Sequence, residues 1–390
     1  MRISGPFGSP PGPKCLQGRP RDRVPETPRI VGLVRTLTLR ELNRATLARQ
    51  LLLERRRLSV TRAVEQLGGV QAQWPPSPYL GLWSRVENFR AEHLVRAIAR
   101  RHVVKATLMR TTLHLVSARD YLAYAGIYRK RRIGELERQL EAMGDAPDLE
   151  DDAERIAALA AEKPRTRAQL LALLDRPKLT LEDRRPWLVW YALAAQAGLL
   201  NGPSSSVWRS HTAGGTFIPA RTWLGADGAG GDEGAARLVR RYLAAFGPAS
   251  RADMTQWTGL PLAVLEPGLR RNSLVRLRDE LGRDLYDLPR APRPPGDSPA
   301  PARLLPRFDN LVLGHDDRRR VLLGEHRSTV IQGGEVAATF LVDGFVAGTW
   351  SLVAGRVTLA AFSPLPRVAR RELEDEAGRL AAFVRASGHA

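Results

Sequence analysis

Apolar residues with helical spacing first appear near residue 38. Thr38 and Glu41 stand three positions apart, as in a capping box, and the leucines that follow recur on one helix face. Ser59 precedes a second apolar run at residues 60–67, which ends at a glycine pair. The patterned part of the chain is therefore predicted to open with two helices.

A third helix at residues 91–101 leads into two β-rich runs, 103–108 and 113–116, which predict paired strands. Helices followed by a short hairpin are typical of a winged-helix unit. Further helices are predicted at about 120–142, and the acidic residues 145–154 then predict a linker or an exposed loop.

The same order of elements recurs twice. The second copy has three helices and then a Gly/Ser-rich wing, at residues 152–162, 166–174, 185–197 and 198–219. The third copy has helices at 233–246, 251–258 and 261–271, a turn at Gly259, and strands at 274–278 and 284–288. It shows the helix-turn-helix and wing most clearly, although such units also serve as structural or protein-binding modules.

Beyond a Pro-rich linker at residues 290–302, the pattern changes to short β-rich runs separated by Gly-containing turns. Strands are predicted at residues 327–332, 336–342, 345–353 and 356–362. We expect them to curl into a small barrel or cup, followed by an amphipathic helix at 370–385.

These elements predict a mainly α, mixed α+β fold, with three tandem winged helix-turn-helix units and a C-terminal β-barrel-like region. The predicted divisions are a disordered extension at 1–35, winged-helix units at 36–144, 150–225 and 232–290, and the barrel-like region with the last helix at 303–388. The Pro-, Gly- and Arg-rich start lacks a helical pattern, which favours a mis-assigned translation start.

Composition narrows the class of protein. The chain has 390 residues, of which 43% are hydrophobic, as expected for a globular protein of two or three domains. It lacks both an apolar run of roughly 20 residues and the apolar block of a secretory signal, so we expect a cytoplasmic protein that does not enter a membrane. Cys15 is the only cysteine, which excludes an internal disulfide and a Cys-based zinc site.

The formal net charge of +19 indicates a polyanionic partner. Arg outnumbers Lys by 55 to 5, and guanidinium groups bind phosphate oxygens in pairs. A coding bias toward Arg explains that ratio but not the net excess of charge. Clusters at 129–132, at Arg270 and Arg271, and at 318–320 are candidates for phosphate contacts, with a solvated surface as the alternative for each.

Gln71 and Gln73 form the most informative local pattern. They follow the glycine pair and precede Pro75, which disfavours helix at Trp74, so residues 70–74 are predicted to be extended. Residues i and i+2 share a face of an extended segment, which puts both amides on one side. Two neutral amides can hold a water or a polar ligand through hydrogen bonds. The alternative is a polar loop face without a function.

Other catalytic signatures are missing from the sequence. It contains no nucleotide-binding glycine fingerprint, no phosphate loop, no hydrolase nucleophile elbow and no histidines at metal-ligand spacing. We therefore expect no cofactor and no metal. Besides the glutamine pair, two segments combine polar and apolar residues in a way that suits a site, at 109–116 and at 308–318.

The Gly-Gly-Val-Gln-Ala-Gln motif and these two segments resemble the winged-helix DNA glycosylases of the AlkZ type, over about residues 36–388. The resemblance implies a C-shaped scaffold of three winged-helix units with a β-barrel. In that family a Gln-x-Gln motif characterises the subgroup that unhooks interstrand crosslinks, whereas Gln-x-Asp relatives excise simpler alkylated bases. Gln73 at the third position favours the first subgroup.

The resemblance implies a monofunctional enzyme that hydrolyses the N-glycosidic bond of N7-alkylated purines, with Gln71 and Gln73 as catalytic residues. Arg110, His114, His315 and Arg318 are secondary candidates for DNA contact or for support of the glutamine loop, and a structural role is as compatible with each. The expected partner is damaged double-stranded DNA, bound by a monomer in the nucleoid. General repair and self-resistance to a genotoxin both fit these residues.

Neutral amides suit this chemistry. Alkylation at N7 makes the purine a cationic leaving group, so the enzyme has to orient a water against C1′ and stabilise the sugar cation without protonating the base. A crosslinked base cannot be flipped fully into a pocket, because it would drag its partner along.

The competing hypothesis is a winged-helix transcriptional regulator without enzymatic activity, but a regulator typically needs one reading module and a dimer interface.

Overall fold

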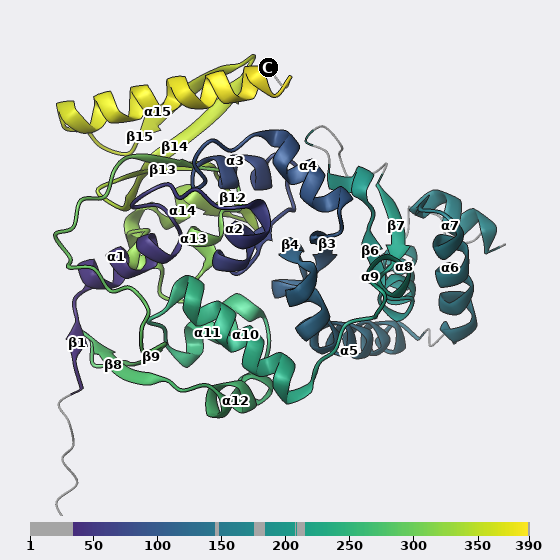
Figure 1. Cartoon of the computed structure of the whole chain (residues 1–390). Coiled ribbons are helices and arrows are strands. Elements are labelled where there is room, and N and C mark those ends of the chain that lie inside the picture. Colours follow the sequence, from purple (N-terminus) through teal and green to yellow (C-terminus); the bar gives the residue numbers. More distant parts are fainter. Residues whose placement is uncertain (1–33, 145–147, 175–183, 207, 209–214, 389–390) are drawn as a thin grey trace, which may run out of the picture. The chain divides into compact units, whose positions relative to one another are not determined.

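The computed structural model describes residues 34–144, 148–174, 184–206, 208 and 215–388, and residues 35–390 belong to one structural unit. The predicted opening helices are present (Figure 1). Helix α1 (Leu39–Arg49) begins at Thr38, and Thr38 and Glu41 form the expected capping box. Helix α2 (Val60–Gln66) follows its cap Ser59, and α3 (Ser77–Trp83) and α4 (Ala91–Ala99) come next.

The hairpins predicted as wings of the first two units lie in a single six-stranded sheet. Its order is β2 (Val70–Gln71), β4 (Leu113–Ser117), β3 (Val103–Thr107), β6 (Leu199–Asn201), β7 (Thr216–Pro219) and β5 (Arg165–Thr166). Strands β3 and β6 pair where Lys105 faces Asn201. The sheet thereby joins segments that are about a hundred residues apart in the sequence.

Four helices lie beside this sheet: α5 (Ala118–Ala142), α6 (Glu150–Glu162), α7 (Arg167–Leu173) and α8 (Arg184–Gln196) (Figure 1). The prediction of a linker or loop at 145–154 is wrong from Glu150 onward, and 145–147 lie outside the described residues. The acidic residues occupy the first turn of α6, where the helix dipole stabilises negative charge.

The elements predicted for the third copy are all present: α10 (Gly231–Phe246), α11 (Arg251–Thr258), α12 (Leu262–Arg271), β8 (Val275–Asp279) and β9 (Asp284–Asp287). Helix α9 (Ala220–Leu224) precedes them. Gly259 ends α11 with a left-handed φ of 71°, as the turn requires. Strand β1 (Thr36–Leu37) pairs in parallel with β8, so the N-terminal strand joins the hairpin of this segment.

The β-rich end differs from its prediction. Strands β10 (Arg303–Leu305), β13 (Thr339–Val342), β14 (Phe345–Val353) and β15 (Arg356–Ala361) form an open four-stranded sheet, and helix α15 (Arg367–Ala386) contacts it (Figure 1). The closed barrel is a wrong prediction for the described residues, because β10 and β15 are opposite edges that do not pair. The strand expected at 327–332 is mostly helix α14 (Arg327–Val330), and only β11 (Ile331–Gln332) pairs with β12 (Glu335–Val336).

Buried ion pairs connect these parts. Arg49 of α1 forms two hydrogen bonds with Asp287 of β9, at 2.7 and 2.8 Å. Arg85, just after α3, forms two with Asp309, at 2.9 and 2.7 Å. Asp309 caps α13 (Asn310–Leu313), so this pair fixes the short helix against α3. No helix among the described segments is long and apolar enough to cross a membrane.

Candidate active site

The glutamine segment starts at a tight turn. Gly68 and Gly69 both have positive φ values, of 74° and 102°, and they turn the chain from α2 into β2. A Cβ at Gly69 would lie 3.1 Å from Val116 and 3.2 Å from Met109, so the turn is packed against the β3–β4 hairpin. The side-chain amide of Asn310 donates to the Gly69 carbonyl oxygen at 2.9 Å. The turn is therefore held from both sides.

Beyond the turn, β2 pairs antiparallel with β4, and Gln71 lies opposite His114. The backbone N–H of Ala72 still bonds to the Leu113 carbonyl, but the chain bends at Gln73 and turns into α3. The predicted extended segment thus ends at Ala72. Gln71 is only 4% exposed, whereas Gln73 is exposed, so the two side chains have different surroundings.

Protein donors engage both amide oxygens. Arg110 Nη2 donates to Gln71 Oε1 at 2.9 Å, and the backbone N–H of Leu113 donates to Gln73 Oε1 at 3.3 Å. Neither amide nitrogen donates a hydrogen bond to any described residue. These two contacts leave both NH₂ groups available to a ligand, and each oxygen keeps a second lone pair.

Arg110 is placed by an unusual backbone. It lies in the left-handed region with φ 52°, and Thr111 does so too with φ 58°, which is uncommon for residues other than glycine. Arg110 Nη1 also donates to the Trp257 carbonyl of α11 at 2.8 Å. A Cβ at Gly259 would lie 2.9 Å from Arg110 Cα, so the end of α11 is packed against this turn. Burial lowers the pKa of Arg110 to about 10, and the group stays charged at neutral pH.

His114 is completely buried beside this arginine. Burial, together with the charge of Arg110, lowers the pKa of His114 to about 3. Its Nδ1 lies 3.0 Å from the Thr112 carbonyl oxygen, which fits an Nδ1–H donor and leaves Nε2 facing Arg110 Nη2 at 3.5 Å. His114 is therefore neutral at pH 7, and it cannot act as a general acid at that pH.

The segment 308–318 divides into buried and accessible parts. His315 is 1% exposed, and its Nε2 lies 2.8 Å from the Phe246 carbonyl oxygen, so it packs in the core and not on a DNA-accessible surface. Burial and the nearby Arg320 lower the pKa of His315 to about 3. Arg318 is half-buried and pairs with no described carboxylate.

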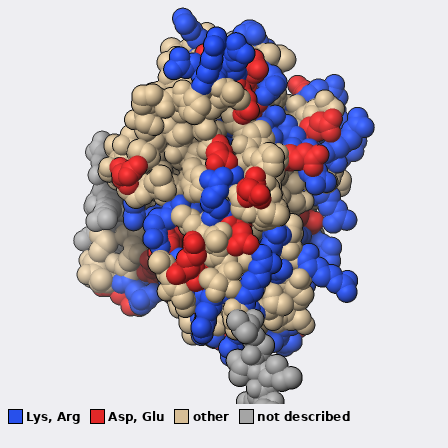
Figure 2. All heavy atoms as spheres, turned by 90° about the vertical axis from the view of Figure 1, so that its left-hand side faces the viewer, with Lys and Arg blue, Asp and Glu red and all other residues tan. Residues whose placement is uncertain are grey.

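Arg270 and Arg271 lie at the exposed end of α12. Arg271 pairs with Glu233 at 2.8 Å, and Arg270 lies 3.8 Å from Glu266. Exposed ion pairs of this kind are weak, so both guanidinium groups are easily released. Figure 2 shows Lys and Arg side chains gathered at the top of the view and down its right-hand side, with some Asp and Glu side chains among them.

Asn310 is a supporting residue that the sequence analysis did not single out. It is buried, and it joins the segment 308–318 to the turn that precedes Gln71. Gln73 and Gln71 also line different cavities: Gln73 borders a large one, whereas Gln71 borders a small one together with Gln50 and Asn310. The contact of Asn310 with the turn joins residues that are 241 positions apart in the sequence, and no local pattern carries that signal.

Comparison with known proteins places this arrangement in a family. Residues 64–383 match the family model described as DNA glycosylase AlkZ-like. The chain is 29% identical over 359 residues to an interstrand DNA cross-link repair glycosylase of Streptomyces sahachiroi, a match that covers 87% of this chain and 94% of the relative.

A solved structure gives the same result. The structure of Streptomyces sahachiroi DNA glycosylase AlkZ matches with a TM-score of 0.75 and 26% identity, and the match covers 90% of this chain and 97% of that one. These findings favour the enzyme over the transcriptional regulator. The chain belongs to the DNA glycosylase AlkZ-like family, and it is a DNA glycosylase.

Proposed function

We propose that this glycosylase hydrolyses the N-glycosidic bond of N7-alkylated purines and unhooks interstrand crosslinks, with Gln71 and Gln73 as its catalytic pair. The crosslink activity named for the S. sahachiroi relative supports the substrate class. The Gln-x-Gln motif supports the same subgroup.

The observation that carries the proposal is that the side chains next to the glutamine pair cannot protonate a leaving base, since Arg110 keeps its proton at neutral pH. Both amides are uncharged, His114 is a neutral imidazole with a pKa of about 3, and no described carboxylate bonds to either glutamine. This arrangement lacks a general acid for an ordinary base. A cationic N7-alkylpurine needs none, because the positive charge already makes it a good leaving group.

Arg110 acts in this proposal as a positioning residue. Its hydrogen bond fixes the Gln71 oxygen, so the amide cannot rotate when a ligand binds. The Leu113 N–H does the same for Gln73. Fixed amides can hold one water in line with C1′ through an N–H donor and an oxygen lone pair, and such positioning provides a large share of many rate enhancements.

The exposure of Gln73 fits a lesion that stays in the helix. A base crosslinked to the opposite strand cannot enter a closed pocket, so the catalytic groups must reach it from outside. Gln73 is exposed and Arg318 is half-buried, so both are accessible, and Arg318 can contribute a positive charge for a phosphate of the DNA backbone. Binding of double-stranded DNA by a monomer is part of the same proposal.

The test is base release from oligonucleotides that carry an N7-alkylguanine monoadduct or an interstrand crosslink. We expect the wild type to release the base from both substrates, and the Gln71→Ala/Gln73→Ala variant to release neither while still binding DNA. Gln256→Ala is the matched control, because Gln256 is exposed on α11 and lines neither of the cavities that Gln71 and Gln73 border. Release by the double variant at the wild-type rate contradicts the assignment of the pair, and release from the monoadduct alone contradicts unhooking.

A further inference from the structure

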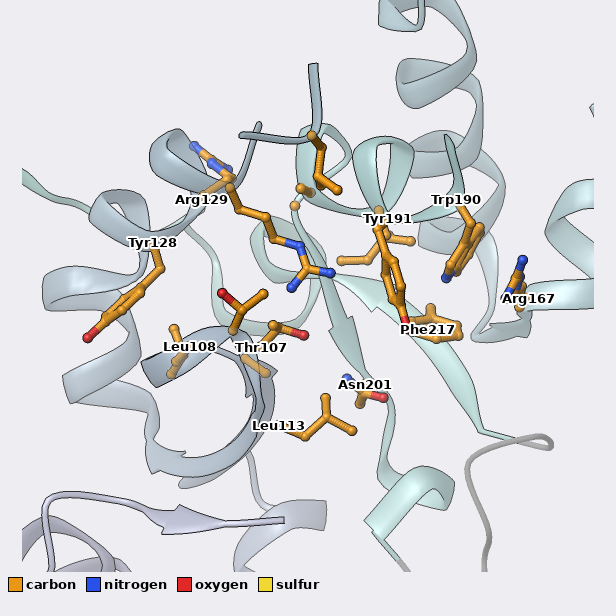
Figure 3. A pocket seen from close by; sticks show the side chains of 18 of the residues that line it. Thr107, Leu108, Leu113, Tyr128, Arg129, Arg167, Trp190, Tyr191, Asn201 and Phe217 are labelled. Atoms are coloured by element: carbon orange, nitrogen blue, oxygen red, sulfur yellow. The ribbon is translucent and has the colours of Figure 1, made fainter. Parts of the chain in front are cut away.

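Gln73 borders a cavity of about 1250 Å³ whose far wall is aromatic. Strands β3 and β4 form one side of it, and α5, α7, α8 and β7 form the others (Figure 3). In Figure 3, Thr107 and Leu113 lie across the cavity from Tyr191 and Phe217. Pockets for drug-sized ligands measure about 300–1,000 Å³, so this one has room for a nucleotide.

Two arginines of the cavity form no ion pair with a described carboxylate. Arg132 of α5 and Arg167 of α7 form neither an ion pair nor a hydrogen bond with any described residue, and Arg132 Nη1, Arg167 Nε and Arg167 Nη2 are buried donors without an acceptor. Burial lowers the pKa of both guanidinium groups, because Tyr191, and Glu135 in the case of Arg132, offset only part of the desolvation. A buried charge without a partner is costly, so these donors mark a place for an anion.

The same arginines lie on aromatic rings. Arg132 Cζ is 4.8 Å from the centre of the Tyr191 ring, and Arg167 Cζ is 4.4 Å from that of Trp187. Trp190 and Phe217 form an edge-to-face pair with ring centres 5.1 Å apart. Flat rings next to guanidinium groups recur where proteins bind unstacked nucleotides, since the base stacks on the ring and the phosphate binds Arg.

The charge of the cavity restricts its occupant. Arg129, Arg132 and Arg167 line it, against a single carboxylate, Glu135. A cationic alkylated base is repelled by this excess of positive charge, whereas a neutral base with its phosphate is attracted. The lesion itself is therefore the wrong occupant, and an undamaged nucleotide is the right one.

We propose that this cavity binds one undamaged nucleotide of the DNA substrate, drawn out of the base stack beside the lesion, with its base against Tyr191 and Trp190 and its phosphate on Arg132 and Arg167. Its position beside the lesion rests on the proposed function of the Gln71–Gln73 pair, because Gln73 borders both sites. When the neighbouring nucleotide swings out of the helix, a gap opens in the base stack. This gap gives Gln73 and its water access to C1′ of a lesion that stays in the helix.

The test is photocrosslinking in the bound complex. Duplexes carry N7-methylguanine on a 2′-fluorinated sugar, which resists hydrolysis, and 5-iodouracil at each position within three base pairs, on either strand. After irradiation, mass spectrometry maps the attachment. We expect one or two positions to crosslink to peptides that contain Trp190, Tyr191 or Phe217, and the other positions not to do so.

The variants then assign the contact. Arg132→Gln/Arg167→Gln removes two charge-assisted contacts. We expect this variant to lose the crosslink and to bind the duplex more weakly, by up to about tenfold. Trp187→Ala, at a side chain that is 43% exposed and therefore tolerant of truncation, is expected to weaken the same crosslink. Arg155→Gln, at an exposed arginine of α6 outside the cavity, leaves both readouts unchanged.

Crosslinks that miss the cavity at every position, or that survive in the Arg132/Arg167 variant, overturn the proposal. Its failure is separate from that of the proposed function, because photocrosslinking needs no base release. Base release that persists without the glutamines, together with a crosslink in the cavity, removes the catalytic assignment and keeps the nucleotide site.

Discussion

Arginines fill two regions of this molecule in opposite ways. Arg49 and Arg85 are buried between α1, α3 and the C-terminal half, and each forms two hydrogen bonds with one carboxylate. Arg132 and Arg167 line the large cavity, and each lies on a ring but forms no ion pair with a described carboxylate. A buried charge is tolerated when its partner is built in. The first region therefore serves the fold, and the second is complete only with a ligand.

The largest effect is expected where the built-in partner is lost. Arg85→Met leaves Asp309 buried without its cation, and it also removes donors to the Gln50 and Gly81 carbonyls. We expect a loss of about 3–5 kcal/mol in the free energy of unfolding. Arg56→Met is the matched control, because Arg56 is 63% exposed in its pair with Glu54, and it should change by less than about 1 kcal/mol. Urea denaturation followed by circular dichroism measures both, and equal losses contradict the comparison.

Gln71 is buried and Gln73 is exposed, so alanine variants at the two positions should differ in stability. Either single alanine variant should lower the rate of base release by about 10²–10³-fold if it removes a group that positions the reaction. Gln71→Ala also takes the acceptor from Arg110, so we expect it to cost about 1–3 kcal/mol of stability, whereas the exposed Gln73 costs almost none. Single-turnover base release and urea midpoints of the two variants test this. A large stability loss in Gln73→Ala contradicts it.

Gly259 links the end of α11 to the glutamine segment. Gly259→Ala places a Cβ 2.9 Å from Arg110 Cα at a φ of 71°, so we expect a loss of about 1–2 kcal/mol and a lower rate of base release. Gly225→Ala provides the control, since Gly225 has a φ of 84° and open space around it. Both variants carry backbone strain, but only Gly259→Ala should displace Arg110. Equal rates of base release by the two variants would contradict a role of the end of α11 in placing Arg110.

The burial of His114 beside Arg110 should make the free energy of unfolding depend on pH. Its pKa in the folded protein is about 3, below the roughly 6.5 of an unfolded chain, so the unfolded state binds more protons between these values. Stability from this residue is fully present above pH 6.5, and it falls by about 1.4 kcal/mol per pH unit as the pH drops toward 3. Urea titrations at pH 7, 6 and 5 of wild type and His114→Gln isolate the effect. Parallel curves for the two proteins contradict it.

The sequence predicted those parts of the molecule that depend on local chemistry. The capping box at Thr38, the cap at Ser59, the helices of the third copy and the turn at Gly259 are all present. These features depend on side chains within four residues of each other. The Gln-x-Gln motif and the segments 109–116 and 308–318 were also identified, since the residues that carry the resemblance are contiguous.

Features set by distant contacts were not predicted. The pairing of β3 with β6 and the open edge of β15 follow from how segments meet across the chain. Helix α14 replaced a predicted strand because its Val- and Thr-containing sequence suits either structure over so short a run. The different burial of Gln71 and Gln73 likewise arises from Arg110 and Asn310, which reach the turn from other segments. The prediction that Gln71 and Gln73 share a face assumed an ideal strand, in which side chains alternate between two faces. The chain bends at Gln73, so the alternation ends there.

The smallest effect on stability is expected for a substitution of a cavity arginine. It contrasts most strongly with the large loss expected for a substitution of Arg85. Arg132→Gln removes a desolvated charge that forms no ion pair, with only the electrostatic attraction of Glu135 to lose, and Gln keeps part of the packing against Tyr191. The lost cation–π contact, worth about 0.5–1 kcal/mol, is offset by the relief of burying an unpaired charge. We therefore expect the urea midpoint of Arg132→Gln to equal that of the wild type or to lie slightly above it. The paired change, Arg85→Gln, should lower the midpoint strongly. A loss of more than about 2 kcal/mol in Arg132→Gln makes that arginine part of the fold, and the cavity then has no need of a ligand.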